Sequence, residues 1–155
     1  MKIQLLTVQK IKDEGIKALI QEYQKRLPRQ WGFEVADCRG EKIQTKGEDE
    51  QKQEGSKLFI AKVQTADHLV LLEESGKERT STEFASHLQS LIDQGKRSIT
   101  FGIGGPAGWS KEALDRADEL ISLGRLTFPY QFATLLVVEQ LYRSYSIMSG
   151  IPYHK

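Results

Sequence analysis

Gly102-Ile103-Gly104-Gly105-Pro106-Ala107-Gly108 is the stretch of sequence that decides the fold class of this chain. It follows an apolar run at 98–101 and precedes a helix start at Ser110. A strand that ends in a glycine-rich loop and then a helix is how α/β proteins bring backbone N–H groups close to a ligand. Glycine suits such a loop because a Cβ would block the approach or forbid the φ values. We therefore expect a ligand-binding loop, with a tight turn that binds nothing as the alternative.

Strands and helices alternate on both sides of this loop. The residue patterns predict strands at 3–8, 31–37, 68–72, 98–103 and 120–128, the last interrupted by Gly124. They predict helices at 14–26, 81–92, 111–118 and 131–148, a helix end at 57–63 and a turn at 74–77. The polar stretch 40–57 is interpreted as a mobile loop or a solvated helix start, with a substrate-facing flap as the functional alternative. The alternation predicts an α/β fold, a mainly parallel sheet with helices on both faces, in one domain of residues 1–155.

Composition excludes several classes of protein. The chain has 155 residues, 39% of them hydrophobic and 28% charged, as in ordinary globular domains. No signal peptide and no apolar run of membrane-spanning length is evident, so we expect a cytoplasmic protein without a membrane partner. Cys38 is the only cysteine and the three histidines are scattered, so no metal site is expected. A net charge of +1 is lower than that of most proteins that bind nucleic acid by themselves. Residues 1–62 are nevertheless slightly basic, with 13 Lys and Arg against 10 Asp and Glu.

Three candidate ligand segments share one position in the fold. Gly102, Gly104 and Ala107 satisfy G-x-G-x-x-G/A, but the loop follows the fourth predicted strand, whereas a dinucleotide fingerprint normally follows the first. No Lys-Ser or Lys-Thr pair closes it, so it is not a P-loop. Ligands of open parallel sheets sit outside the carboxyl ends of strands. Leu72, Gly104 and the segment 123–128 all lie at such ends, which predicts one shared pocket.

The last helix and the tail carry the remaining candidates. The helix is apolar over more than one face, which favours a homodimer, with burial inside the monomer as the alternative. Glu139 and Arg143 are four residues apart on it, close enough to fix one another's geometry. In the tail, Tyr153 could stack on a base, His154 could move protons near neutral pH, and Lys155 could meet phosphate. The alternative is a frayed terminus.

Taken together, these motifs resemble one family over essentially the whole chain. They are Leu72 after a buried strand, Gly-Gly-Pro-Ala-Gly at 104–108, Leu-Gly-Arg-Leu-Thr-Phe at 123–128, Glu139 with Leu-Tyr-Arg at 141–143, and the terminal Pro-Tyr-His. The chain resembles the RlmH family of small SPOUT-class methyltransferases, which methylate N3 of a pseudouridine in large-subunit (23S) ribosomal RNA. The resemblance implies a homodimer, a C-terminal trefoil knot, S-adenosylmethionine as cofactor, and the ribosome as partner.

The resemblance also assigns residues. It implies cofactor contacts from Leu72, Gly104, Leu123, Gly124, Arg125, Leu126, Thr127 and Phe128, and catalytic roles for Glu139, Arg143, Tyr153 and His154. The family often has an acid where Ala107 stands and a small residue where Arg125 stands, so the role of the Arg125 side chain is open. We expect His154 to act as general base, Arg143 to stabilise developing charge, Tyr153 to orient the base, and Glu139 to position Arg143.

Two other functions stay open at this point. One is a SPOUT methyltransferase that acts on transfer RNA. The other is a non-catalytic module, flavodoxin-like or Rossmann-like, that holds a nucleotide and has a dispensable tail.

Overall fold

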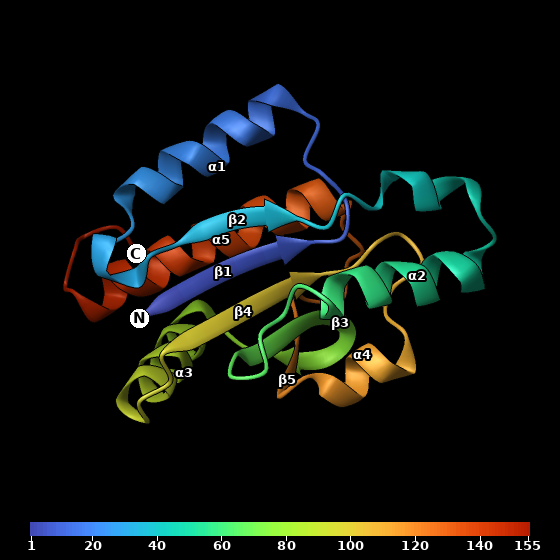
Figure 1. Cartoon of the computed structure of the whole chain (residues 1–155). Coiled ribbons are helices and arrows are strands. Elements are labelled where there is room, and N and C mark those ends of the chain that lie inside the picture. The colour runs from blue at the N-terminus through green and yellow to red at the C-terminus, as the bar shows by residue number, and fades with distance from the viewer.

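Five parallel strands form a single sheet in the computed structural model, in the order β2-β1-β4-β3-β5 (Figure 1). The structure describes the backbone of residues 1–155 and every side chain except those of Glu41 and Gln44. The strands are β1 (Lys2–Thr7), β2 (Glu34–Asp37), β3 (His68–Glu78), β4 (Ser98–Ile103) and β5 (Glu119–Ser122). Every neighbouring pair is parallel. The α/β fold with a parallel sheet is therefore confirmed.

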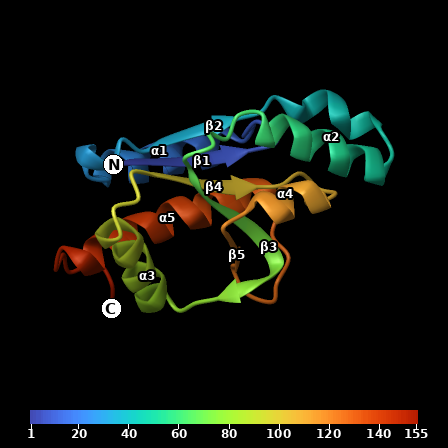
Figure 2. The same ribbon diagram turned by 60° about the horizontal axis from the view of Figure 1, so that its bottom comes forward.

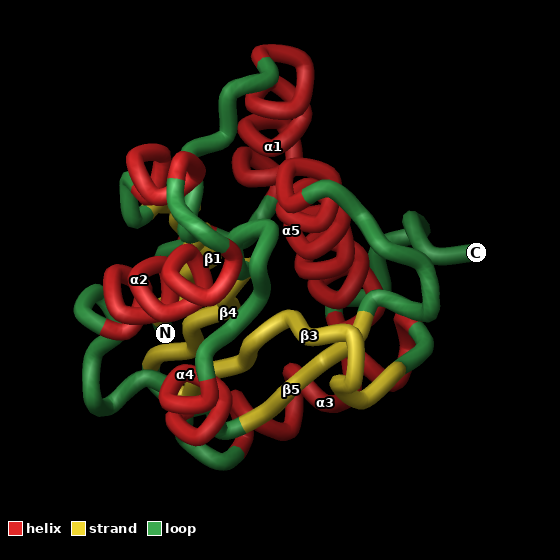
Figure 3. Tube along the Cα trace, turned by 90° about the vertical axis from the view of Figure 1, so that its right-hand side faces the viewer, coloured by secondary structure: helices red, strands yellow, loops and turns green.

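Helices cover both faces of this sheet, as expected. One face packs against α1 (Glu14–Arg26), α3 (Ser81–Asp93) and α5 (Tyr130–Met148), and the other against α2 (Glu48–Ile60) and α4 (Lys111–Arg116). Figures 2 and 3 show these layers from two further directions. Successive strand residues point to opposite faces, so Leu5 joins the α1/α5 core while Leu6 joins the α2/α4 core. Among the described residues, no helix is long and apolar enough to cross a membrane.

Local capping explains why the helix starts could be predicted. The Asp13 carboxylate accepts a hydrogen bond from the Ile16 N–H at 2.9 Å and caps α1. Thr80 and Glu83 form a capping box at the start of α3. Pro129 precedes α5 and blocks any extended pairing before it. In each case the signal is a side chain within three residues of the helix start, so it is readable without tertiary information.

The second strand is shorter than expected. Residues 31–37 were predicted as a strand, but Arg29–Trp31 forms a 3₁₀ turn and Gly32 has a φ of 46°. Trp31 is 5% exposed and packs edge-on against Tyr145 of α5. The tertiary contact of the indole ring thus decides the conformation of a segment whose composition favours a strand.

The polar stretch before α2 folds as a helix start rather than as a loop. Residues Gly40–Thr45 form a 3₁₀ helix, and α2 begins at Glu48. Three acids, Glu48, Asp49 and Glu50, lie in the first turn of α2, where the helix dipole favours negative charge. The solvated helix start is therefore confirmed, and a substrate-facing flap stays a prediction.

The strands next to the predicted site also differ from expectation. No turn interrupts β3 at 74–77; instead Leu72 and Lys77 both pair with Ile121, so the four residues between them bulge out of the ladder. The strand β5 ends at Ser122 because Gly124 has a φ of 114°, which turns the chain out of the sheet. Residues 123–128, predicted as the end of a strand, are therefore a loop.

Two of the histidines, although distant in sequence, meet on one carboxylate. The His68 Nε2 and His87 Nε2 atoms lie 2.8 Å and 2.7 Å from the Glu119 carboxylate, and Arg79 Nη2 donates to it at 3.1 Å. These contacts fasten the start of β5 to β3 and α3. The expectation that the histidines are scattered is wrong for this pair. Among the described residues no group of three or more His, Cys, Asp or Glu side chains could hold a metal ion.

This cluster predicts how stability depends on pH. Burial alone raises the pKa of Glu119, but the hydrogen bonds from His68 and His87 outweigh it, and the pKa lies below its ordinary value of 4.5. A carboxyl whose pKa is lowered by folding stabilises the fold above its unfolded pKa, and that stabilisation disappears as pH falls through the folded pKa. Urea unfolding of wild type and Glu119→Gln should differ by about 1–3 kcal/mol at pH 6 and converge toward pH 3. Parallel pH profiles of the two proteins would contradict this assignment.

Candidate functional site

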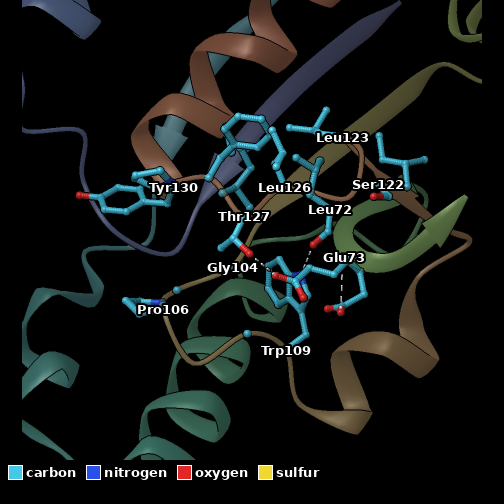
Figure 4. Close-up of a pocket in the computed structure, with 18 of the residues that line it drawn as sticks. Leu72, Glu73, Gly104, Pro106, Trp109, Ser122, Leu123, Leu126, Thr127 and Tyr130 are labelled. Carbon is cyan, nitrogen blue, oxygen red and sulfur yellow. Dashed lines mark hydrogen bonds between the residues drawn. The ribbon is translucent and has the colours of Figure 1, made fainter. Parts of the chain in front are cut away.

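A cavity of about 850 Å³ opens at the carboxyl ends of β3, β4 and β5 (Figure 4). Its walls come from three segments: 72–74 after the first part of β3, 103–109 after β4, and 121–130 between β5 and α5. The structure therefore brings together the three loops that were predicted to converge. Seven of the eight residues assigned to the cofactor line it: Leu72, Gly104, Leu123, Gly124, Leu126, Thr127 and Phe128. Arg125 does not line the cavity, and its side chain is exposed.

Trp109 ties two of these walls together. Its indole Nε1–H donates a hydrogen bond to the Leu72 carbonyl oxygen at 2.8 Å, and its ring packs edge-on against Phe59. A Cβ on Gly104 would lie 3.1 Å from the Trp109 ring, so glycine lets the loop lie against the indole. Trp109 was not among the residues predicted from the sequence. The available signal was a tryptophan directly beside the glycine loop, in a position where its N–H needs a partner.

The glycine loop is a closed turn. The Gly108 N–H donates to the Gly105 carbonyl oxygen at 3.0 Å, with Pro106 at the second position of the turn and a φ of 76° at Gly108. Gly102 serves core packing instead, because a Cβ there would lie 2.5 Å from both Leu71 Cδ2 and Phe59 Cζ. One N–H of the loop is thus already satisfied, which fits a wall of a pocket better than a cradle for phosphate.

The loop after β5 is held by short-range hydrogen bonds. The Ser122 hydroxyl donates to the Gly124 carbonyl oxygen at 3.0 Å and accepts from the Gly124 N–H at 3.1 Å. Thr127 Oγ1 donates to the Glu74 carboxylate at 3.1 Å, which links this loop to the bulge of β3. Leu126, 74% exposed, and Phe128, 36% exposed, form the rim. The cavity therefore has fixed walls and an apolar, exposed edge.

The charge of the cavity is negative. Glu73 and Glu74 line it, and no Lys or Arg is among the described residues that do so. A phosphate-bearing ligand would meet two carboxylates without a compensating cation. A cationic ligand with a flat apolar part suits both the carboxylates and the apolar walls. A sulfonium-bearing nucleoside has this chemistry.

The four residues assigned to catalysis also meet, but in a second cluster at the end of α5. Glu139 Oε1 accepts from Arg143 Nη2 at 2.7 Å, from Arg143 Nε at 3.0 Å, and from the Tyr153 hydroxyl at 2.9 Å. The guanidinium carbon of Arg143 lies 4.7 Å from the centre of the Tyr153 ring. Tyr23 of α1, which was not predicted as a site residue, places its hydroxyl 3.2 Å from that of Tyr153. The tail is thus docked and not frayed.

The pKa shifts within this cluster show which of its side chains keep their protons at neutral pH. Burial, and then the hydrogen bonds with Tyr23 and Glu139, raise the pKa of Tyr153 well above its ordinary value. The hydrogen bond with Glu139 likewise raises the pKa of Arg143. The phenol therefore stays protonated at neutral pH, so Tyr153 can donate or stack but cannot serve as a base.

The imidazole of His154 lies against the guanidinium of Arg143. Its Nδ1 lies 3.3 Å from Arg143 Nη1, and a guanidinium can only donate hydrogen bonds. As a hydrogen bond, this contact has Nδ1 as its acceptor. A general base needs a lone pair on the imidazole, and the Nδ1 lone pair faces Arg143.

The two clusters lie at opposite ends of α5. Tyr130 and Ala133 at the start of the helix line the cavity, while Arg143 lies ten residues after Ala133. At 1.5 Å per residue, the helix separates them by about 15 Å. Figure 1 shows α5 running from the carboxyl end of the sheet toward the opposite end, where the C-terminus lies. Within one chain, the tail does not reach the cavity.

Comparison with known proteins gives full-length matches. The family described as "Predicted SPOUT methyltransferase" matches residues 1–154. Proteins named "Ribosomal RNA large subunit methyltransferase H" are similar over all of both chains: the one from Latilactobacillus sakei is 40% identical, and the one from Enterococcus faecalis is 38% identical. Among solved structures, Archaeoglobus fulgidus Nep1 bound to S-adenosylhomocysteine is 13% identical, with a TM-score of 0.44 over 83% of this chain and 70% of that chain.

Proposed function

The chain belongs to the SPOUT methyltransferase family, and we propose that it transfers a methyl group from S-adenosylmethionine to N3 of a pseudouridine in large-subunit (23S) ribosomal RNA. We take residues 1–155 as one catalytic domain that works in the cytoplasm on assembled ribosomes. The trefoil knot at the C-terminus stays a prediction from the family. The observation that carries the proposal is the acidic, apolar cavity at the loops where the family signature lies.

The cavity fits the cofactor by its chemistry. Leu72, Leu123 and Leu126 offer apolar surface for an adenosyl group, and the close approach of Gly104 to Trp109 keeps the backbone wall thin. Glu73 and Glu74 give a negative field that favours a sulfonium. When bound, S-adenosylmethionine would supply an electrophilic methyl group. The absence of a lining cation among the described residues disfavours a dinucleotide or a nucleoside triphosphate.

The separation of the two clusters supports a shared active site. We propose a two-fold homodimer in which the tail of one protomer lies at the cavity of its partner. Such an interface is isologous, so each cavity would receive one tail. The exposed apolar side chains support this arrangement, because Leu126, Phe128 and Phe132 lie at the cavity end of the chain and Ile151 lies at the tail end. Burial of these side chains would contribute to association.

The tail residues would then act on the RNA base. N3 of pseudouridine is a weakly acidic imide N–H, so its proton must leave before or during methyl transfer. We propose that Arg143 moves from His154 Nδ1 to the carbonyl oxygens of the base, where it stabilises the developing negative charge. This movement frees the Nδ1 lone pair to accept the N3 proton. Tyr153 would stack on or orient the base, and Glu139 would keep its hydrogen bonds with Nε and Nη2 of Arg143 while Nη1 turns toward the base.

The direct test is incubation with labelled S-adenosylmethionine and either assembled ribosomes or bulk transfer RNA. We expect label in large-subunit ribosomal RNA, at a pseudouridine located by mass spectrometry of nuclease fragments. Label in transfer RNA would favour the alternative substrate. Tight nucleotide binding without methyl transfer to either RNA would favour a non-catalytic binding module and contradict the proposal.

A further inference from the structure

Three basic side chains project from the carboxyl edge of β1 and β2, beside the cofactor cavity. We call Lys10, Lys12 and Arg39 the basic ridge. All three are exposed. Lys10 lies between the buried Gln9 and Ile11, Arg39 lies between the buried Cys38 and Gly40, and Lys12 follows the buried Ile11. Buried neighbours anchor the backbone and leave the cationic side chain directed outward.

The segment that carries the two lysines is fastened to the rim of the cavity. The hydroxyl of Tyr130, a cavity residue, donates to the Lys10 carbonyl oxygen at 2.7 Å. The next residue of α5, Gln131, accepts at Oε1 from the N–H groups of Lys12 and Asp13 at 2.8 Å and 2.9 Å. Ile11 is 8% exposed and packs into the core. The lysines are therefore held at a fixed place relative to the cavity (Figure 3 looks onto this edge).

Arg39 has a strained backbone. Its φ of 56° and ψ of 42° place it in the left-handed region, and no other residue apart from glycine has a positive φ among those described. Its N–H donates to Asp37 Oδ1 at 2.9 Å, and its neighbours bind β1 through Cys38 N to Thr7 O and Gly40 N to Val8 O, each at 2.9 Å. Glycine would be the favoured residue at this φ. An exposed arginine that brings no core contact to such a position points to a functional role for its side chain.

Charge divides this edge of the sheet into two halves. The half over β3 carries Glu73 and Glu74, and the half over β1 and β2 carries the basic ridge. Acids are also present in the second half, but Asp13 caps α1 through the Ile16 N–H and Asp37 accepts the Arg39 N–H. These two carboxylates accept hydrogen bonds from backbone N–H groups, and the side chains of Lys10, Lys12 and Arg39 are exposed. A polyanion that approaches the cavity is therefore attracted to one side of it.

We propose that the basic ridge binds the phosphate backbone of the substrate RNA beside the target nucleotide and so positions that nucleotide over the cavity. The inference rests on the proposed function. It identifies the surface through which a chain of net charge +1 engages RNA. A few cations in fixed places can set the register of a nucleic acid without reading its sequence.

The test compares wild type with Lys10→Ala/Lys12→Ala/Arg39→Gly in the methyl-transfer assay on ribosomes. Because glycine suits the backbone at position 39, this replacement should not destabilise the fold, and the thermal midpoint of Arg39→Gly alone should equal or exceed that of wild type. We expect the KM for ribosomes to be about tenfold higher, or more, in the triple variant. The loss of each exposed cation should raise KM about two- to fivefold. The slope of log KM against log salt should fall by about 1 for each lost phosphate contact.

The control removes two exposed charges from the opposite, amino edge of the sheet, in Lys96→Ala/Arg97→Ala. This variant should keep the KM and the salt slope of wild type, and both variants should bind S-adenosylhomocysteine as wild type does. If the triple variant keeps the wild-type KM and slope, the ridge is not an RNA contact, whereas the proposed function stands. If wild type itself transfers no methyl group, the proposed function fails independently.

Discussion

Mixing two inactive variants is expected to restore methyl transfer. The first variant ends at Pro152 and lacks Tyr153, His154 and Lys155; the second, Gly104→Leu, carries a side chain that occupies the cavity beside Trp109. Loss of the general base and its neighbours should lower turnover by about 100- to 10,000-fold. In a mixed dimer, the intact tail of one protomer meets the intact cavity of the other. Because half of randomly mixed dimers are hybrid and each hybrid has one intact site, we expect about one quarter of the wild-type activity.

The same experiment distinguishes the shared site from two other arrangements. A site built within one chain would stay inactive in every mixture, at any ratio of the two variants. A dispensable tail would leave the truncated variant active by itself. Binding of S-adenosylhomocysteine to the truncated variant serves as the control, since its cavity is unchanged. The mixture is prepared by unfolding and refolding the two proteins together, with the separately refolded variants as blanks.

Replacement of Gly76 by alanine is expected to destabilise the fold strongly. Gly76 lies in the bulge of β3, and a Cβ there would lie 2.5–2.7 Å from the backbone carbonyl carbon, nitrogen and Cα of Ile121. Backbone atoms of a paired strand cannot rotate away as a side chain can. We expect a loss of about 3 kcal/mol in the free energy of unfolding, at the upper end of the range for overpacking.

This loss should be accompanied by weaker cofactor binding. Ile121 belongs to β5, which leads directly into the cavity loop 122–130, so displacement of β5 moves one wall of the cavity. Urea unfolding and calorimetric titration with S-adenosylhomocysteine measure the two effects. Gly47→Ala is the matched control, because a Cβ at that glycine meets nothing within 4 Å. An equal, small effect of both substitutions would show that the bulge adapts and that Gly76 is not required there.

Most of the helices could be predicted because their signals are local. Asp13, Thr80 and Pro129 each act within a few residues of the helix they begin. The wrong predictions of secondary structure lie in segments whose conformation depends on a distant part of the chain. The bulge of β3 depends on the register with Ile121, and the turn before β2 depends on the contact of Trp31 with Tyr145. No window of neighbouring residues contains either interaction.

The candidate site, too, could be predicted from the sequence only in part. The sequence by itself determined the parallel α/β fold, because its strands and helices alternate, and it determined the place of the cavity, because ligand loops follow the carboxyl ends of parallel strands. It also indicated the tail residues, by their types and order. Only the tertiary structure decided that Trp109 joins two walls, that Tyr23 reaches Tyr153, and that α5 separates Arg143 from the cavity. The physical reason is that hydrogen bonds and helix length act through space, between residues that lie far apart along the chain.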